Sequence, residues 1–275
     1  MAFKRSACLC TAALITAAAA PAQADSGDDQ AEGEPTRYLL GVSLRNGPEY
    51  EGASRRETKL RPVWAAKIGR FRLTTSGGSA LLGFGRDGAG AGASTQLIDT
   101  DRWRLGISAS VDSGRDSGDA STTQGLPDVR RTLRAKLYVN YSLTKDWNVG
   151  VSTSQDVLGR QGGMTLSLDT GYRLYRSDTT EWTTGVGVSA ANRQNMRSYF
   201  GVPASAVAAS GKPEYNPGAG LRDMHVGINV KHAVNKHWFV FGGAGASRLL
   251  GPAADSPLVE RNGGASANIG VAWRN

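Results

Sequence analysis

Apolar and polar residues alternate with a period of two along most of the chain. Residues 131–141 are the clearest case, with Leu133, Ala135 and Leu137 on one side and Arg134 and Lys136 on the other. A period of two places each set on one face of a β-sheet. We predict twelve strands, at residues 36–46, 58–67, 70–76, 91–98, 103–112, 131–141, 147–155, 164–174, 181–190, 222–233, 237–247 and 265–274. Ten is the competing count, because the glycine-rich residues 77–93 leave the third and fourth strands in doubtful register.

Tryptophan follows a short polar turn four times, as in Thr144-Lys145-Asp146-Trp147. Aromatic side chains gather at the lipid–water boundary of transmembrane β-barrels, next to the short turns. A soluble sandwich has little reason to repeat an indole at this place. We therefore interpret the four tryptophans as an aromatic girdle, and they are Trp103, Trp147, Trp182 and Trp238.

The connections between the predicted strands are of two kinds. Short ones lie at 68–69, 99–102, 142–146, 175–180 and 234–236, and mostly long ones lie at 47–57, 77–90, 113–130, 156–163, 191–221 and 248–264. Their alternation is typical of outer-membrane barrels, with short periplasmic turns and longer extracellular loops. We therefore predict an all-β fold, an antiparallel transmembrane β-barrel over residues 36–275.

The N-terminus is typical of a secretory signal peptide. Lys4 and Arg5 precede an apolar stretch that ends in the small-residue cleavage pattern Ala22-Gln23-Ala24. We predict a signal peptide over 1–24, cleaved near Ala24, and a flexible periplasmic lead-in over the acidic residues 25–35. Both cysteines lie in the signal peptide, so the mature chain has no thiol chemistry. The predicted location of the mature protein is the outer membrane of a Gram-negative bacterium.

The chain is basic, with a formal net charge of +8. The basic residues are scattered singly and form no run of five, which fits loops and a barrel lumen better than a nucleic-acid surface. If the apolar faces meet outer-membrane lipid, the opposite faces line the lumen. The candidate lumen residues are Arg45, Arg104, Asp112, Arg134, Lys136, Asp169, Arg173, Asp223, Lys231 and Arg274. This basic interior predicts either a narrow pore for anions or a lumen closed by paired side chains, and the pattern leaves both open.

Catalytic chemistry finds little support in the sequence. His225 shares a strand face with Asp223, but there is no Gly-x-Ser-x-Gly elbow to supply a nucleophile. No spacing of His, Cys and carboxylates indicates a metal site, and no glycine-rich loop precedes a helix. We predict a non-enzymatic protein without cofactors.

The loop at 191–221 is the candidate recognition element, because loops on a rigid barrel carry function. It brings together basic and aromatic residues, namely Arg193, Arg197, Tyr199, Phe200, Lys212 and Tyr215.

Three stretches resemble the MipA/OmpV family of outer-membrane proteins. They are residues 47–52 (GPEYEG), the loop from Tyr199 to Asp223, and residues 248–259 with Arg248-Leu249-Leu250-Gly251 and Ala254-Asp255-Ser256-Pro257. The resemblance implies a scaffold that joins a murein lytic transglycosylase to a peptidoglycan synthase, while other members are described as porin-like. It also implies insertion by the barrel-assembly machinery, which reads a terminal aromatic residue. Here the last aromatic residue is Trp273, followed by Arg274 and Asn275.

Overall fold

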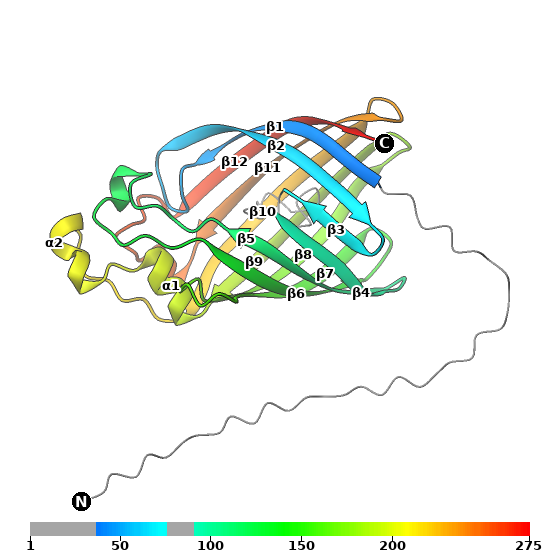
Figure 1. Ribbon diagram of the computed structural model, residues 1–275. Coiled ribbons are helices and arrows are strands. Elements are labelled where there is room, and N and C mark those ends of the chain that lie inside the picture. Colours follow the sequence, from blue (N-terminus) through cyan, green and yellow to red (C-terminus); the bar gives the residue numbers. More distant parts are fainter. Residues whose placement is uncertain (1–36, 76–90) are drawn as a thin grey trace, which may run out of the picture. The chain divides into compact units, whose positions relative to one another are not determined.

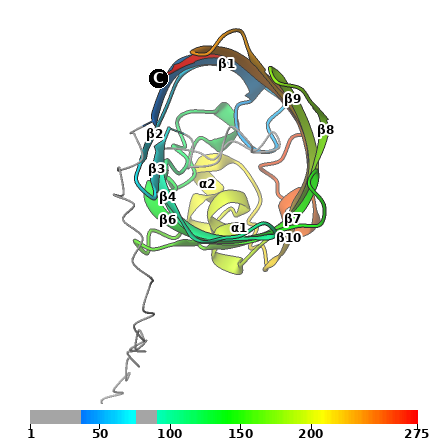
Figure 2. The ribbon, with the colours of Figure 1, turned by 90° about the vertical axis from the view of Figure 1, so that its right-hand side faces the viewer.

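Twelve antiparallel strands close into a barrel in the computed structural model, which describes residues 37–75 and 91–275. Each strand pairs with its neighbours in the chain, and β1 pairs with β12 to close the ring, so that Leu40 lies opposite Trp273 (Figures 1 and 2). The strands are β1 Arg37–Pro48, β2 Arg56–Ile68, β3 Phe71–Thr74, β4 Gly92–Asp99, β5 Trp103–Asp112, β6 Thr132–Ser142, β7 Trp147–Asp156, β8 Met164–Arg176, β9 Thr180–Ala191, β10 Gly220–Ala233, β11 Trp238–Leu249 and β12 Gly263–Arg274.

The predicted fold and the count of twelve strands are confirmed, and the alternative of ten is wrong. All twelve predicted ranges overlap the observed strands, and most observed strands extend one or two residues further. The third strand is the shortest, at four residues. The predicted signal peptide and lead-in, and most of the glycine-rich segment before β4, lie outside the described residues.

The outer face of the barrel is apolar. Leu40, Val42 and Leu44 on β1 are exposed, while Ser43 between them is buried. The same alternation recurs on β8, where Leu166 and Leu168 are exposed. A face this apolar is the surface that a hydrocarbon layer requires, and the polar face is left to line the inside. None of the described helices is long and apolar enough to cross a membrane.

A side-chain cap builds four of the short turns. In each, the first turn residue donates its N–H to the carbonyl three residues on, and its side-chain oxygen accepts the N–H of that residue. The pairs are Thr100 with Trp103, Thr144 with Trp147, Ser177 with Thr180 and Asn235 with Trp238. Serine, threonine and asparagine mimic a backbone turn in this way.

Trp182 differs from the other three girdle residues in its place. Because Ser177 caps the turn at Thr180, β9 begins there and Trp182 is two residues inside the strand. The opposite strand β8 carries a register shift between Arg173 and Tyr175, so that Tyr175 pairs with Trp182. Tryptophan thus follows the turn directly in three cases and not in the fourth.

Short helices occupy the loop end of the barrel. They are η1 Ser121–Thr123, α1 Arg193–Phe200, η2 Ala204–Ala206, α2 Val207–Ser210 and α3 Gly251–Ala254. In the view along the barrel, α2 lies within the outline of the ring and α1 lies at its edge, and the side view places both at the end opposite the short turns (Figures 1 and 2). The sequence analysis assigned no helix to these loops.

Candidate functional site

The long loops pack into a cap with an apolar interior of its own. One cluster joins Met196 and Phe200 of α1 to Leu249 and Ala253, and a second joins Leu126 and Val202 to Ala206 and Leu258. Met196 and Val202 are fully buried. The loops between β5 and β6, β9 and β10, and β11 and β12 therefore form one packed body rather than separate flexible segments.

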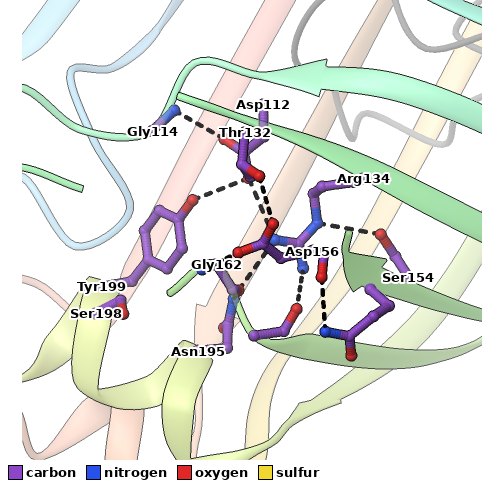
Figure 3. A network of polar contacts seen from close by, with 12 residues as sticks. Asp112, Gly114, Thr132, Arg134, Ser154, Asp156, Gly162, Asn195, Ser198 and Tyr199 are labelled. Atoms are coloured by element: carbon purple, nitrogen blue, oxygen red, sulfur yellow. Dashed lines mark hydrogen bonds and ion pairs between the residues drawn. The ribbon is translucent and has the colours of Figure 1, made fainter. Parts of the chain in front are cut away.

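A polar network joins this cap to the inner wall of the barrel (Figure 3). Arg134 of β6 donates from Nη1 to Asp112 Oδ2 at 3.3 Å and to the carbonyl of Gly162 at 3.0 Å, and from Nε to Ser154 Oγ at 3.1 Å. The hydroxyl of Tyr199 in α1 donates to the same Asp112 oxygen at 2.9 Å. Burial and the Asp112 charge raise the pKa of Tyr199, so the hydroxyl stays protonated and continues to donate.

Asp156 at the end of β7 organises the loop that carries Gly162. It accepts from Thr132 Oγ1, from the N–H of Gly162 at 2.8 Å and from the N–H of Leu158 at 3.0 Å. The carbonyl of Gly162 in turn accepts from Asn195 Nδ2 of α1 at 2.7 Å. Asp156, Thr132 and Asn195 are all buried, so these bonds are shielded from water and connect the wall to α1.

A second polar chain runs along the inner wall on β8, β9 and β10. His225 Nε2 lies 2.8 Å from Asp169 Oδ1 and its Nδ1 lies 3.2 Å from Asp223 Oδ1. Ser189 donates to the other oxygen of Asp223. Gly187 is required beneath this chain, because a Cβ there would collide with Asp169 and His225.

This chain does not have the order of a nucleophilic triad. In a triad the imidazole accepts the proton of the serine hydroxyl, and a carboxylate orients the imidazole. Here Ser189 bonds to the carboxylate of Asp223, and both imidazole nitrogens face carboxylates. The arrangement packs polar side chains against one another. Among the described residues, no group of three or more His, Cys, Asp or Glu is placed to hold a metal ion.

Most of the ten candidate lumen residues have a partner. Asp112 pairs with Arg134, and Asp169 and Asp223 meet through His225. Three arginines have partners near the short turns: Arg104 lies 3.4 Å from Asp99, Arg173 lies 3.2 Å from Asp146, and Arg274 Nε donates to the Lys236 carbonyl at 3.0 Å. Lys231 lies opposite Glu181 in the register of β10 and β9. Arg45 and Lys136 face inward on β1 and β6.

The inward-facing charges are unevenly distributed around the wall. On β1–β6 the described basic residues are Arg45, Lys59, Arg61, Lys67, Arg72, Arg104, Arg134 and Lys136, against Glu57, Asp99 and Asp112. On β7–β12 the inward-facing acids are Asp156, Asp169, Glu181 and Asp223, and the inward-facing bases are Arg173, Arg176, Lys231 and Arg274. One half of the wall is therefore basic and the other is close to balanced.

Two carboxylates tie the loops of the cap together. Glu260 accepts from Ser54, through both its hydroxyl and its N–H, and from Thr122, so it joins three loops. These hydrogen bonds lower the pKa of Glu260 to about 2. Glu51 forms an ion pair with Arg222, whose guanidinium lies 5.8 Å from the centre of the Phe200 ring.

Four of the six candidate recognition residues contact other parts of the cap, and the two arginines are exposed. Phe200 is 2% exposed, Tyr199 bonds to Asp112, and Tyr215 donates to the Pro252 carbonyl at 2.8 Å, so these aromatic residues build the cap. Lys212 Nζ donates to the Pro257 carbonyl at 3.3 Å. Arg193 and Arg197 are exposed on the outer face of α1.

Several residues that assemble the cap were not predicted from the sequence, including Asp156, Asn195, Arg222 and Glu260. Arg222 lies at a register shift between Leu221 and Asp223, which strict alternation does not foresee. Asn192 carried a readable signal, because its side chain caps α1 by accepting the N–H of Asn195. The turn motif of a serine, threonine or asparagine three residues before the next strand was also readable.

Comparison with known proteins gives one family and several barrels of low sequence identity. The solved structures that the chain matches include a KdgM porin in complex with disordered oligogalacturonate (TM-score 0.41, 10% identity, 86% of this chain and 98% of that one). Another is a Pseudomonas aeruginosa FadL homologue (TM-score 0.40, 9% identity, 87% of this chain and 89% of that one).

Curated relatives in Escherichia coli (strain K12) and Shigella flexneri, both called MltA-interacting protein, are 26% identical over 161 residues. The match covers 58% of this chain and 63% of each relative, just under two thirds of their length. The family model described as MltA-interacting protein MipA matches residues 40–275, which include every strand after β1 and most of β1 itself. The chain therefore belongs to the MipA family.

Proposed function

We propose that this barrel is a non-enzymatic scaffold of the Gram-negative outer membrane that docks a murein lytic transglycosylase from the periplasm. Membership of the MipA family carries the proposal, because its curated relatives are called MltA-interacting protein. A peptidoglycan synthase is the second partner that an adaptor role requires.

The short-turn end is the docking face in this proposal. The start of β1 and the end of β12 pair with each other at that end, which is also the end with the short turns. Exposed charged side chains such as Arg102 and Lys145 occupy neighbouring turns, since the N–H of Ser142 donates to the Arg102 carbonyl at 2.8 Å. The loop end is taken up by the packed cap.

A direct binding measurement tests the scaffold. The purified barrel in detergent is immobilised, and the soluble part of the lytic transglycosylase from the same cell is passed over it. We expect an acidic partner surface opposite these basic side chains, so Arg102→Glu with Lys145→Glu should raise the Kd by about tenfold or more by placing like charges in the interface. The matched control is Arg131→Gln with Arg160→Gln at the opposite end, which should leave the Kd unchanged. Absence of binding by the unmodified barrel would refute the scaffold.

The basic half of the inner wall favours a second candidate function, a narrow porin-like channel for small anionic solutes. Rings of arginine and lysine select anions at close range. The pairing of most lumen charges supports the scaffold instead, since paired charges attract a passing anion less strongly than free ones.

A further inference from the structure

The two ends of the apolar belt differ in the side chains that they present outward. At the short-turn end the outward-facing residues include Tyr38, Trp103, Trp147, Trp182 and Trp238, all exposed. Among the described outward-facing strand residues, the half of the barrel nearest the loops has no aromatic side chain. Three of the last outward positions at this end are arginines, namely Arg56 on β2, Arg131 before β6 and Arg248 on β11.

The arginines are most concentrated beside β6 and β7. Arg131 continues the outward side of β6, two residues before Leu133. The N–H of Val157 donates to the Leu133 carbonyl at 3.0 Å, and Arg160 Nη1 donates to the Arg131 carbonyl at 2.8 Å. Between them, Val157 and Leu158 are 51% and 52% exposed. Arg131 and Arg160 therefore lie next to two exposed aliphatic side chains.

Helix α1 adds two more cations next to this loop. Ser198 Oγ donates to the Gln161 carbonyl at 2.7 Å, which fixes α1 against the segment after Arg160. The inner side of α1 buries Met196 and Phe200, and the opposite side exposes Arg193 and Arg197. We call Arg131, Arg160, Arg193 and Arg197 the arginine rim.

No carboxylate neutralises the arginine rim within the described part of the chain, where none of the four forms an ion pair. Asp156 is buried and already accepts from Thr132, Gly162 and Leu158. Asp128 on the neighbouring loop accepts the N–H of Ser117 at 2.8 Å. The rim is thus a net positive surface at the edge of an apolar belt.

An arginine rim and an aromatic girdle suit different lipid surfaces. Indole and phenol rings are favoured at ordinary phospholipid interfaces. Guanidinium groups bind phosphate with paired hydrogen bonds and are weakly hydrated, which favours them where phosphates are dense. The outer leaflet of a Gram-negative outer membrane consists of a phosphorylated glycolipid. We propose that the arginine rim binds the phosphates of this glycolipid while Val157 and Leu158 contact its acyl chains.

Binding of diphosphoryl lipid A tests the proposal. The full-length barrel in phosphatidylcholine nanodiscs is titrated with diphosphoryl lipid A, with its dephosphorylated form and with inorganic phosphate. We expect tight binding of the diphosphoryl lipid alone, and a rise in Kd of about tenfold or more in Arg131→Gln with Arg160→Gln, since each substitution removes charge-assisted hydrogen bonds to phosphate. The control is Arg70→Gln with Arg102→Gln, two exposed arginines at the short-turn end.

Equal loss in the control, equal binding of the dephosphorylated lipid, or saturation by inorganic phosphate at the same concentration would each overturn the proposal. The rim variant is also tested for capture of the lytic transglycosylase, which it should retain. The lipid site and the scaffold can therefore fail independently.

Discussion

At the scale of single residues, hydrogen bonds to charged side chains connect segments that are distant in the chain. Asp112 accepts from Tyr199, 87 residues away, and Glu260 accepts from Ser54, 206 residues away. Each carboxylate accepts from several donors, so one side chain connects more than one segment of the chain. Such residues hold the cap in place.

Glu260 makes the cap sensitive to acid. Its pKa in the folded cap is about 2, below the ordinary 4.5. The carboxylate therefore stabilises the cap fully above pH 4.5, and the stabilisation is lost as the pH falls from 4.5 towards 2. Limited proteolysis of the loops across this range should show increasing cleavage, with the strands resistant. In Glu260→Gln the cap should be cleaved more readily at neutral pH and should respond less to acid. Glu214→Gln, at an exposed glutamate of the same cap, is the control and should behave as the unmodified protein.

At the scale of elements, the strands are specified by local sequence and the cap is specified by contacts between distant loops. Each strand follows from a local period of two and from turn residues within three positions of the next strand. The cap follows from contacts between loops, and its helices are too short to be stable alone. Helix α1 has eight residues and depends on burying Met196 and Phe200 against α3 and the end of β11.

Truncation of Phe200 should therefore loosen the cap without opening the barrel. Phe200→Ala removes a side chain that is 2% exposed, and we expect a loss of about 3–5 kcal/mol in the local stability of the cap. Hydrogen exchange should accelerate at the amides of α1 and α3 and stay unchanged in β5–β8. Gln194→Ala, at an exposed position of the same helix, should leave all rates unaltered. Uniform acceleration over cap and strands would show that the two do not unfold separately.

At the scale of the whole molecule, the barrel has two unlike ends and two unlike inner halves. Short turns and aromatic residues mark one end, and a packed cap with outward arginines marks the other. Across the lumen, the β1–β6 wall is basic and the β7–β12 wall is nearly balanced. Field lines between unlike walls orient a charged solute if one enters.

Conductance across a planar bilayer separates the two candidate functions. If the lumen conducts, the unmodified barrel should favour anions, and Arg72→Glu with Lys136→Glu should lower the anion-to-cation permeability ratio. Arg134 is avoided in this test because it holds the cap through Asp112 and Gly162. The outward pair Arg131→Gln with Arg160→Gln should leave selectivity unchanged. If the unmodified barrel gave no conductance in the bilayer, the channel would be refuted and the scaffold would remain.

The fold was predictable because the features that specify it, alternation and turn residues, are local in the sequence. Alternation of Leu133, Ala135 and Leu137 with Arg134 and Lys136 places the two sets on opposite faces of β6, whatever the rest of the chain does. The polar turns specify where the chain reverses, and their lengths separate one end of the barrel from the other. These features determined twelve antiparallel strands and an apolar outer face.

Only the tertiary structure decided what the loops and the lumen contain. Nothing within a few residues of Tyr199 indicates that its hydroxyl meets Asp112, or that His225 lies between Asp169 and Asp223 on neighbouring strands. A register shift turns Arg222 towards Glu51, against the alternation. Side-chain pairing across a closed barrel depends on register and loop packing, which are set by contacts between distant segments. The sequence by itself determined the barrel, and the assembled cap and wall decided which polar residues remain exposed to act on a partner.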